Sequence, residues 1–358
     1  MVSLVEGNGP LRGLGAGSGV NSGQSALSSK EVMDSADDAS TASEVYVDKF
    51  GFLTDTPAAS FHLRRDNARL EKWQEMLVRW EFMKRSRQKK LKQRTRKGVP
   101  DCLRGKVWLD FAATRSTETS DLYKELTLSE EISLYEAQIR KDVYRTFPKH
   151  VFFRELAGQD ALYRVLRAYS LHNRDIGYCQ GMGFIAGLLL TYGPEDSAFL
   201  LMDSLMKGYG LQSLYAAGMP GVYKTVYVAQ GLGLTYLPKV FRHLQDINLS
   251  ATLYAVNWIM TLFACSLPVE TVVRIWDSFF LEGYKIVYRV FLGLLKLCEK
   301  EIRSQPFEEA LQTIKDKAQS VSSEELLPAA FSFNLSRTRI AQLEREFEAQ
   351  GNPSLQRW

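Results

Sequence analysis

Cysteine and histidine are both scarce in this sequence of 358 residues, with four of each. The four cysteines are Cys102, Cys179, Cys265 and Cys298. They form no CxxC pair, and no histidine lies at the spacing of a metal-ligand set. The composition therefore predicts neither a disulfide framework nor a zinc site, and it favours reduced thiols in an intracellular protein.

An excess of charge of one sign is missing too. The chain has 45 basic and 41 acidic residues, a net charge of +4, so bulk charge indicates no particular partner. The N-terminus continues into glycine-rich and acidic sequence instead of a basic region followed by an apolar core. We therefore expect no secretory signal.

One long uncharged run raises the question of a membrane-spanning helix. Residues 247–269 contain no charged side chain, and that length could cross a bilayer. Asn257 would then lie near the middle of the hydrocarbon, with several serines and threonines around it. Burial inside a helical protein accounts for these polar residues better than lipid does, so the run predicts core structure.

Alternating strand patterns are absent, whereas apolar residues recur at intervals of three and four along most of the chain. Prolines at 194, 220, 238 and 268 mark the expected helix boundaries. The sequence predicts an all-α fold. The clearest helices are expected over residues 67–95, 160–171, 184–192, 286–302, 306–318 and 335–350.

Composition divides the chain into four parts. Residues 1–43 are rich in Gly, Ser, Ala and Asp and predict a disordered tail, because such sequence buries too little apolar surface to order itself. Residues 44–97 supply an N-terminal docking element with aromatic anchors, then a basic helix. Residues 98–303 form the helical core domain, and helices within 304–358 complete or extend it.

The end of that first long helix, residues 84–97, is strongly basic. One interpretation is an ordinary solvated helix end, where cations also suit the helix dipole. The other is peripheral contact with an anionic membrane or an acidic partner. Nucleic acid is not expected, since no aromatic residues interleave the charges and the rest of the chain is not basic.

Two short polar islands interrupt the apolar sequence, at residues 139–148 and 176–182. The first contains Arg145 and the second Gln180. A guanidinium can neutralise charge on a transferring phosphoryl group, and a carboxamide can orient an attacking water. The chain has no GxxxxGK[ST] phosphate loop, so any nucleotide that these residues serve would belong to another protein.

Several motifs occur in a fixed order. They are Lys97-Gly-Val-Pro-Asp-Cys-Leu-Arg-Gly-Lys-Val-Trp108, the two islands, Trp258-Ile-Met-Thr-Leu-Phe263, Leu267-Pro-Val-Glu270 and Arg274-Ile-Trp-Asp-Ser-Phe-Phe280. In kind, order and spacing the chain resembles the TBC-domain family of Rab GTPase-activating proteins from about residue 98 to 302. The resemblance implies an all-α TBC domain of two helical subdomains. Arg104, Trp108, Trp258, Trp276 and Asp277 are interpreted as packing residues.

The resemblance also implies roles within the islands. Arg145, in the pattern Ile-x-x-Asp-x-x-Arg, corresponds to an arginine finger, and Gln180, in Tyr-Cys-Gln-Gly, to a glutamine finger. Asp142 is expected to orient the arginine because it lies three residues earlier. Tyr178 and Gly181 are expected to be further supporting residues of the site, and Gly177 and Gly181 would let the backbone approach a partner closely. In one departure from the family pattern, Gly183 replaces an asparagine that would brace the following helix, and this could weaken that support by about 1 kcal/mol.

The sequence thus predicts a GTPase-activating protein for a Rab-family small GTPase in its GTP state. It would contribute catalytic residues to its partner's site without being an NTPase itself. No cofactor of its own is expected, since GTP and Mg²⁺ belong to the GTPase. The expected location is the cytoplasm, with peripheral association to endomembranes left open. The alternative is a TBC-fold scaffold or Rab effector that binds a GTPase or membrane without stimulating hydrolysis.

Overall fold

The structure is a computed structural model that describes residues 46–55, 63–113 and 119–351, with side chains described from residue 66 onward in the second range. The predicted disordered tail, residues 1–43, lies outside the described residues. Helices make up most of the described chain, which confirms the all-α prediction. The exception is a small antiparallel hairpin of β1 (Tyr46–Val47) and β2 (Leu53–Thr54).

The N-terminal basic region differs from the prediction of one long helix over 67–95. It forms three helices, α1 (Leu63–Val78), α2 (Trp80–Ser86) and α3 (Gln88–Arg96), with breaks at Arg79 and Arg87. On one uninterrupted helix, Lys84 and Arg87 would fall on the same face as the buried Trp73 and Leu91. The breaks let the apolar residues enter the core while Arg87 stays exposed.

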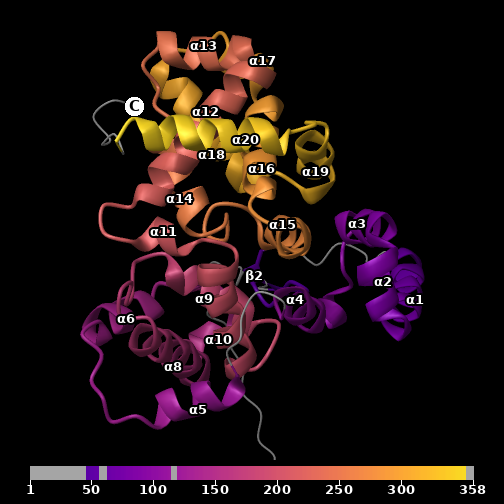
Figure 1. Ribbon diagram of the computed structural model, residues 1–358, viewed down its shortest axis with the longest axis vertical. Coiled ribbons are helices and arrows are strands. Elements are labelled where there is room, and N and C mark those ends of the chain that lie inside the picture. The colour runs from indigo at the N-terminus through magenta and orange to yellow at the C-terminus, as the bar shows by residue number, and fades with distance from the viewer. Residues whose placement is uncertain (1–45, 56–62, 114–118, 352–358) are drawn as a thin grey trace, which may run out of the picture. The chain divides into compact units, whose positions relative to one another are not determined.

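The remaining helices form two groups (Figure 1). In the first group the neighbours of α8 pack around it. This group contains η1 (Asp101–Leu103), α4 (Arg104–Ala112), α5 (Ser120–Leu128), α6 (Glu136–Val143), α7 (Val151–Arg154), α8 (Leu156–His172), α9 (Met182–Leu190), α10 (Glu195–Asp203) and the π-helical turn η2 (Ser204–Gly208).

The second group packs around α16. It contains α11 (Gln212–Tyr215), α12 (Pro220–Tyr236), α13 (Pro238–Asp246), α14 (Thr252–Met260), α15 (Val269–Glu282), α16 (Lys285–Leu297), α17 (Glu299–Ile302), α18 (Phe307–Ser320), α19 (Ser323–Phe331) and α20 (Arg337–Ala349). The expected two helical subdomains are therefore present. The helix α19 was not predicted, although Ser322 and Glu325 form a capping box that the sequence displays.

The uncharged run at residues 247–269 behaves as core sequence, as predicted. Its helix α14 has nine residues, and Trp258 is buried within it. Among the described residues, no helix has both the length and the apolar character that a membrane crossing requires. The prolines fulfil their expected role as boundaries, since Pro220 and Pro238 occupy the first positions of α12 and α13.

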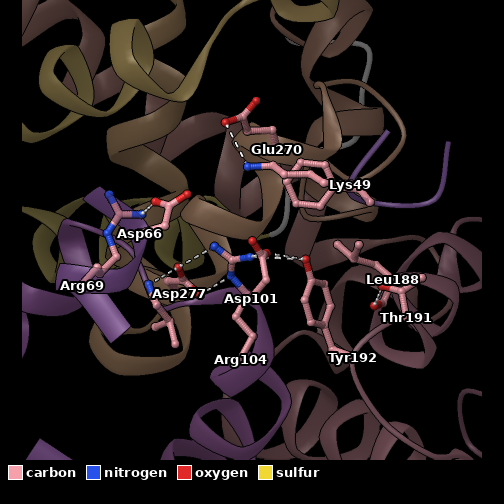
Figure 2. A network of polar contacts seen from close by, with 12 residues as sticks. Lys49, Asp66, Arg69, Asp101, Arg104, Leu188, Thr191, Tyr192, Glu270 and Asp277 are labelled. Carbon is pink, nitrogen blue, oxygen red and sulfur yellow. Dashed lines mark hydrogen bonds and ion pairs between the residues drawn. The ribbon is translucent and has the colours of Figure 1, made fainter. Parts of the chain in front are cut away.

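A buried polar network joins the first helical group to the second (Figure 2). Asp277 of α15 is fully buried and accepts hydrogen bonds from the backbone N–H of Val99 at 2.8 Å, Arg104 Nε at 3.1 Å and Trp108 Nε1 at 3.0 Å. Arg104 also contacts Asp101 and the hydroxyl of Tyr192. These residues are structural, as predicted. They hold α4 against α15, although the two helices are far apart in the sequence.

Candidate functional site

Arg145 lies in the turn that follows α6. Its backbone N–H donates to the carbonyl oxygen of Asp142 at 3.2 Å, and the hydroxyl of Thr146 donates to the same oxygen at 2.8 Å. The Arg145 side chain is 54% exposed, and its Nη2 lies 2.5 Å from Asp142 Oδ1. A carboxylate therefore holds one edge of an otherwise exposed guanidinium fork, which is the arrangement that the spacing of three residues predicted.

The carboxylate of Asp142 is itself held from a second segment. Its side chain is only 6% exposed, and Oδ2 accepts a hydrogen bond of 2.6 Å from the hydroxyl of Tyr178. Burial, together with this hydrogen bond to Asp142, raises the pKa of Tyr178 above its ordinary range, so the phenol remains a donor. The two islands are thus connected through one buried carboxylate.

Gln180 is exposed in the turn that leads into α9. The turn depends on two glycines in the left-handed region, Gly177 with φ of +61° and Gly181 with φ of +106°. A Cβ on Gly177 would lie 2.0 Å from the ring of Tyr135, so only glycine fits there. Gly181 immediately precedes α9 as its N-terminal cap residue. Backbone geometry thus presents Gln180 at the surface.

The segments of Arg145 and Gln180 also approach each other at a second place. Gly183, in the first turn of α9, is buried, and a Cβ there would lie 2.9 Å from Thr146 Oγ1. Together with the bond between Tyr178 and Asp142, this contact brings side by side two segments that are far apart in sequence. The structure therefore places both predicted site residues on adjacent exposed turns.

Part of the chain matches a known protein family. Residues 101–303, more than half of the chain, match the Rab-GTPase-TBC domain. The chain belongs to this family.

Among curated relatives, the TBC chain is 34% identical over 292 residues to the human ecotropic viral integration site 5 protein homolog, an alignment that covers 80% of the chain and 35% of that protein. It is 30% identical over 290 residues to the Rab GTPase-activating protein tbc-11 of Caenorhabditis elegans, covering 78% of the chain and 31% of that protein. The chain thus spans about a third of the length of these relatives.

Among solved structures, the flagellar RabGAP TBC domain of Chlamydomonas matches with a TM-score of 0.67 and 32% identity. The match covers 81% of this chain and all of that domain. The helical architecture described above is therefore that of a TBC domain.

The hairpin of β1 and β2, which lies outside the matched TBC residues, packs against the residues that follow Arg145, and the sequence alone does not connect the two. The N–H of Leu53 donates to the carbonyl of Lys149 at 2.8 Å, and the N–H of Val151 donates to the carbonyl of Gly51 at 2.9 Å. Phe52 packs edge-on against Phe147, with ring centroids 5.6 Å apart. The aromatic residues of 46–52 were the only signal in the sequence that this hairpin docks on the domain.

The Cys179 thiol directly precedes Gln180 in the sequence. Burial raises the pKa of the Cys179 thiol, so the protonated form is favoured beside Gln180. Within the described residues, no group of three or more His, Cys, Asp and Glu side chains is placed to hold a metal ion. Each of the four cysteines is free.

Proposed function

We propose that this chain is a GTPase-activating protein for a Rab-family small GTPase in its GTP-bound state. The proposal rests on one observation above the others. A single buried carboxylate, Asp142, binds both the exposed Arg145 and the segment that presents Gln180. An exposed arginine that is held in place loses less conformational entropy when it enters a partner's site.

In this proposal Arg145 enters the nucleotide site of the GTPase and stabilises negative charge on the γ-phosphoryl group as it transfers to water. The guanidinium has five N–H donors in a planar fork, and Asp142 contacts one terminal nitrogen, so donors remain for phosphate oxygens. An arginine supplied in trans accelerates hydrolysis by roughly 10³–10⁵ in GTPases generally. GTP and Mg²⁺ are supplied with the GTPase.

Gln180 supplies the second part of the mechanism. Its carbonyl oxygen accepts a hydrogen bond from the attacking water, and its amide group donates to the γ-phosphate. Gly181 supports this role because it has no side chain that would project beside the glutamine. Tyr178 acts indirectly, as a positioning residue that keeps Asp142 in place for Arg145.

Single-turnover GTP hydrolysis by a panel of GTP-loaded Rab proteins tests the two residues. With the Rab that responds, Arg145→Ala and Gln180→Ala are each expected to reduce the stimulated rate by at least roughly 10²-fold. Matched controls are Arg345→Ala on α20 and Gln312→Ala on α18, exposed side chains on helices of the second group. Both controls should leave the rate unchanged.

If the Arg145→Ala and Gln180→Ala variants both stimulated GTP hydrolysis fully, the mechanism in which these two residues act in the GTPase site would be wrong. The scaffold alternative makes a different prediction. It would be supported if the unmodified chain bound a Rab in a GTP-dependent manner and yet left hydrolysis at its intrinsic rate across the whole panel.

We also propose that the chain works in the cytoplasm and touches anionic membranes through the basic segment 84–97. The charges of this segment are only partly neutralised within the fold. Lys84 pairs with Glu81, and Lys92 and Arg96 pair with Glu282, whereas Lys89 and Lys90 are exposed on α3. The exposed cations favour the proposal, since anionic lipid attracts each nearby cation by about 1 kcal/mol.

A further inference from the structure

Exposed large apolar side chains are concentrated in one part of the described chain. Twelve such side chains are exposed among the described residues, and seven of them lie between residues 128 and 156, on both sides of Arg145. The three most exposed of the seven lie in the connection from the end of α5 to α6, and they are Leu128 at 83%, Ile132 at 78% and Leu134 at 96% (Figure 1). Single exposed apolar residues are ordinary, but three within seven residues indicate an interaction surface. They belong to an apolar loop, residues 128–135.

The backbone of the apolar loop is held by one arginine of α8. Arg167 has a side chain that is only 14% exposed, and its Nη1 donates to the carbonyl of Leu126 at 3.3 Å. Its Nη2 donates to the carbonyls of Ser129 at 2.7 Å and Glu131 at 2.6 Å. Three backbone acceptors are thus satisfied by a single side chain. A loop held in this way loses little conformational entropy when a partner binds.

Side chains at the end of the loop alternate between the protein and the solvent. Ser133 is buried, and its hydroxyl oxygen lies 2.7 Å from that of Ser170. It also accepts a hydrogen bond from the N–H of Tyr135 at 3.2 Å, and Tyr135 packs against the core. Because Ser133 and Tyr135 are held inward, Ile132 and Leu134 are turned outward. The exposure of the two aliphatic side chains therefore follows from the anchored backbone.

The apolar loop contacts the turn that presents Gln180. The ring of Tyr135 occupies the space beside Gly177, where a Cβ would lie 2.0 Å from it. Gly177 precedes Gln180 by three residues, a length of chain that spans at most about 11 Å. Any folded partner that Gln180 enters is wide enough to cover the apolar loop as well.

Charge around the loop helps to identify its occupant. Residues 125–136 contain four glutamates and no lysine or arginine. A cytoplasmic membrane surface is itself negatively charged, so it would repel this segment. In a GTPase, by contrast, the γ-phosphate and its Mg²⁺ order the switch segments beside the nucleotide. These segments lie next to any group that reaches the γ-phosphate.

We propose that the apolar loop docks on an apolar surface formed by the switch segments of the GTPase. The inference rests on the proposed function, because the partner of the loop is taken to be the partner of Gln180. Leu128, Ile132 and Leu134 supply affinity and selectivity for the GTP state, whereas Arg145 and Gln180 supply the rate. Binding and chemistry are thus assigned to different residues of one surface.

A titration of stimulated GTP hydrolysis separates affinity from rate. Single-turnover rates are measured with a responding GTP-loaded Rab over a range of concentrations of the chain. The triple substitution Leu128→Gln, Ile132→Gln and Leu134→Gln is expected to raise the half-saturating concentration on the order of tenfold or more. The rate at saturation should stay within about twofold of that of the unmodified chain. Arg145→Ala, by contrast, lowers the rate at saturation.

The matched control is the triple substitution Val78→Gln, Phe82→Gln and Leu234→Gln. It removes three exposed apolar side chains from α1, α2 and α12, and it should change neither quantity more than about twofold. Thermal denaturation establishes that both triple variants fold.

Direct binding gives a second readout that does not depend on hydrolysis. The same Rab is loaded with GDP or with a non-hydrolysable GTP analogue, and its affinity for the chain is measured in each form. The unmodified chain should prefer the analogue-loaded form, and the loop variant should bind the two forms with more nearly equal affinity. If the chain binds a Rab without stimulating it, this measurement alone decides the role of the loop.

The possible failures are distinguishable. Unchanged affinity in the loop variant would overturn the docking proposal, while loss of stimulation in Arg145→Ala would still support the proposed function. If the unmodified chain neither bound nor stimulated any Rab, the proposed function would fail, and the assigned partner of the loop with it. Equal effects of the two triple variants would also contradict the proposal.

Two other occupants give results of their own, and either would overturn the proposal. A loop variant that lost binding to phosphatidylcholine vesicles, with Rab binding unchanged, would assign the loop to lipid. A loop variant that lost a dimer seen by sedimentation of the unmodified chain, with Rab binding unchanged, would assign it to a second copy of this chain.

Discussion

Asp142 shows how much can depend on one side chain. Its two carboxylate oxygens have different partners, Arg145 and Tyr178, and its backbone carbonyl accepts from Thr146. Because the carboxyl is almost fully buried, it cannot rotate to serve one partner without leaving the other unpaired. The orientation of the proposed arginine finger is thus determined partly by a tyrosine in a different segment.

Gly183 is the second informative residue, since it is a buried glycine inside the first turn of α9. In a helix, alanine is favoured over glycine by about 1 kcal/mol, so Gly183→Ala would ordinarily stabilise. A Cβ here meets Thr146 Oγ1 at 2.9 Å, and that hydroxyl is held by its bond to Asp142. We therefore expect Gly183→Ala to bring no gain in the free energy of unfolding, measured by urea denaturation.

A change at Thr146 provides the control. In a Thr146→Ala background the hydroxyl is gone, and Gly183→Ala should stabilise by up to about 1 kcal/mol. In a Thr146→Ser background the hydroxyl remains, and so should the penalty. The same effect of Gly183→Ala in all three backgrounds would show that the contact with Thr146 does not decide the outcome.

At the scale of elements, the hairpin of β1 and β2 depends on a neutral histidine. His150 Nδ1 accepts a hydrogen bond from the N–H of Phe152 at 3.1 Å, while Nε2 lies 2.9 Å from the carbonyl of Phe50. Only the tautomer with hydrogen on Nε2 satisfies both contacts. Burial lowers the pKa of His150 below its ordinary value of 6.5, although the Phe50 carbonyl and the charge of Asp48 oppose that shift.

This shift has a definite sign in the pH dependence of stability. A histidine with a lowered pKa in the folded state binds more protons when unfolded, so its contribution is complete above about pH 6.5 and is lost as pH falls through the folded value. We expect His150→Gln to destabilise the protein at pH 7.5 and the difference from the unmodified chain to shrink by pH 5. Thermal denaturation of both proteins between pH 5 and pH 7.5 measures this difference in stability. A difference that stayed constant or widened toward pH 5 would contradict the assigned tautomer.

Elements held by local chemistry were predictable from sequence, and those held by distant contacts were not. The pairing of Asp142 with Arg145 follows from a spacing of three residues, and the starts of α12 and α13 follow from their prolines. The bond from Tyr178 to Asp142 spans 36 residues and left no local signal. The breaks that separate α1, α2 and α3 arise from packing on the rest of the fold, which a helical pattern does not contain.

At the scale of the whole molecule, Asp277 ties the segment before α4 to the second helical group. It is fully buried and accepts from Val99, Arg104 and Trp108. Asp277→Asn keeps the shape and removes the charge, so that the buried guanidinium of Arg104 loses its buried carboxylate and keeps only the partly exposed Asp101 as an anionic partner. We expect a loss of about 3–5 kcal/mol in the free energy of unfolding, measured by denaturant titration.

A surface ion pair gives the comparison for this prediction. Glu131 lies 2.8 Å from Arg174, and both side chains are substantially exposed. Glu131→Gln should therefore cost at most about 1 kcal/mol. If the two substitutions cost the same, the network around Asp277 would not be the connection between the two halves that its geometry indicates.

The hairpin has a further consequence for the order in which the chain folds. Phe50 and His150 are separated by 100 residues, and a hairpin with strands of two residues is not stable by itself in water. During synthesis the hairpin emerges long before residues 147–151, and closing so long a loop carries an entropy cost that local helices avoid. We therefore expect residues 147–151, which closely follow Arg145, to reach their final conformation late, after the helices on both sides have formed.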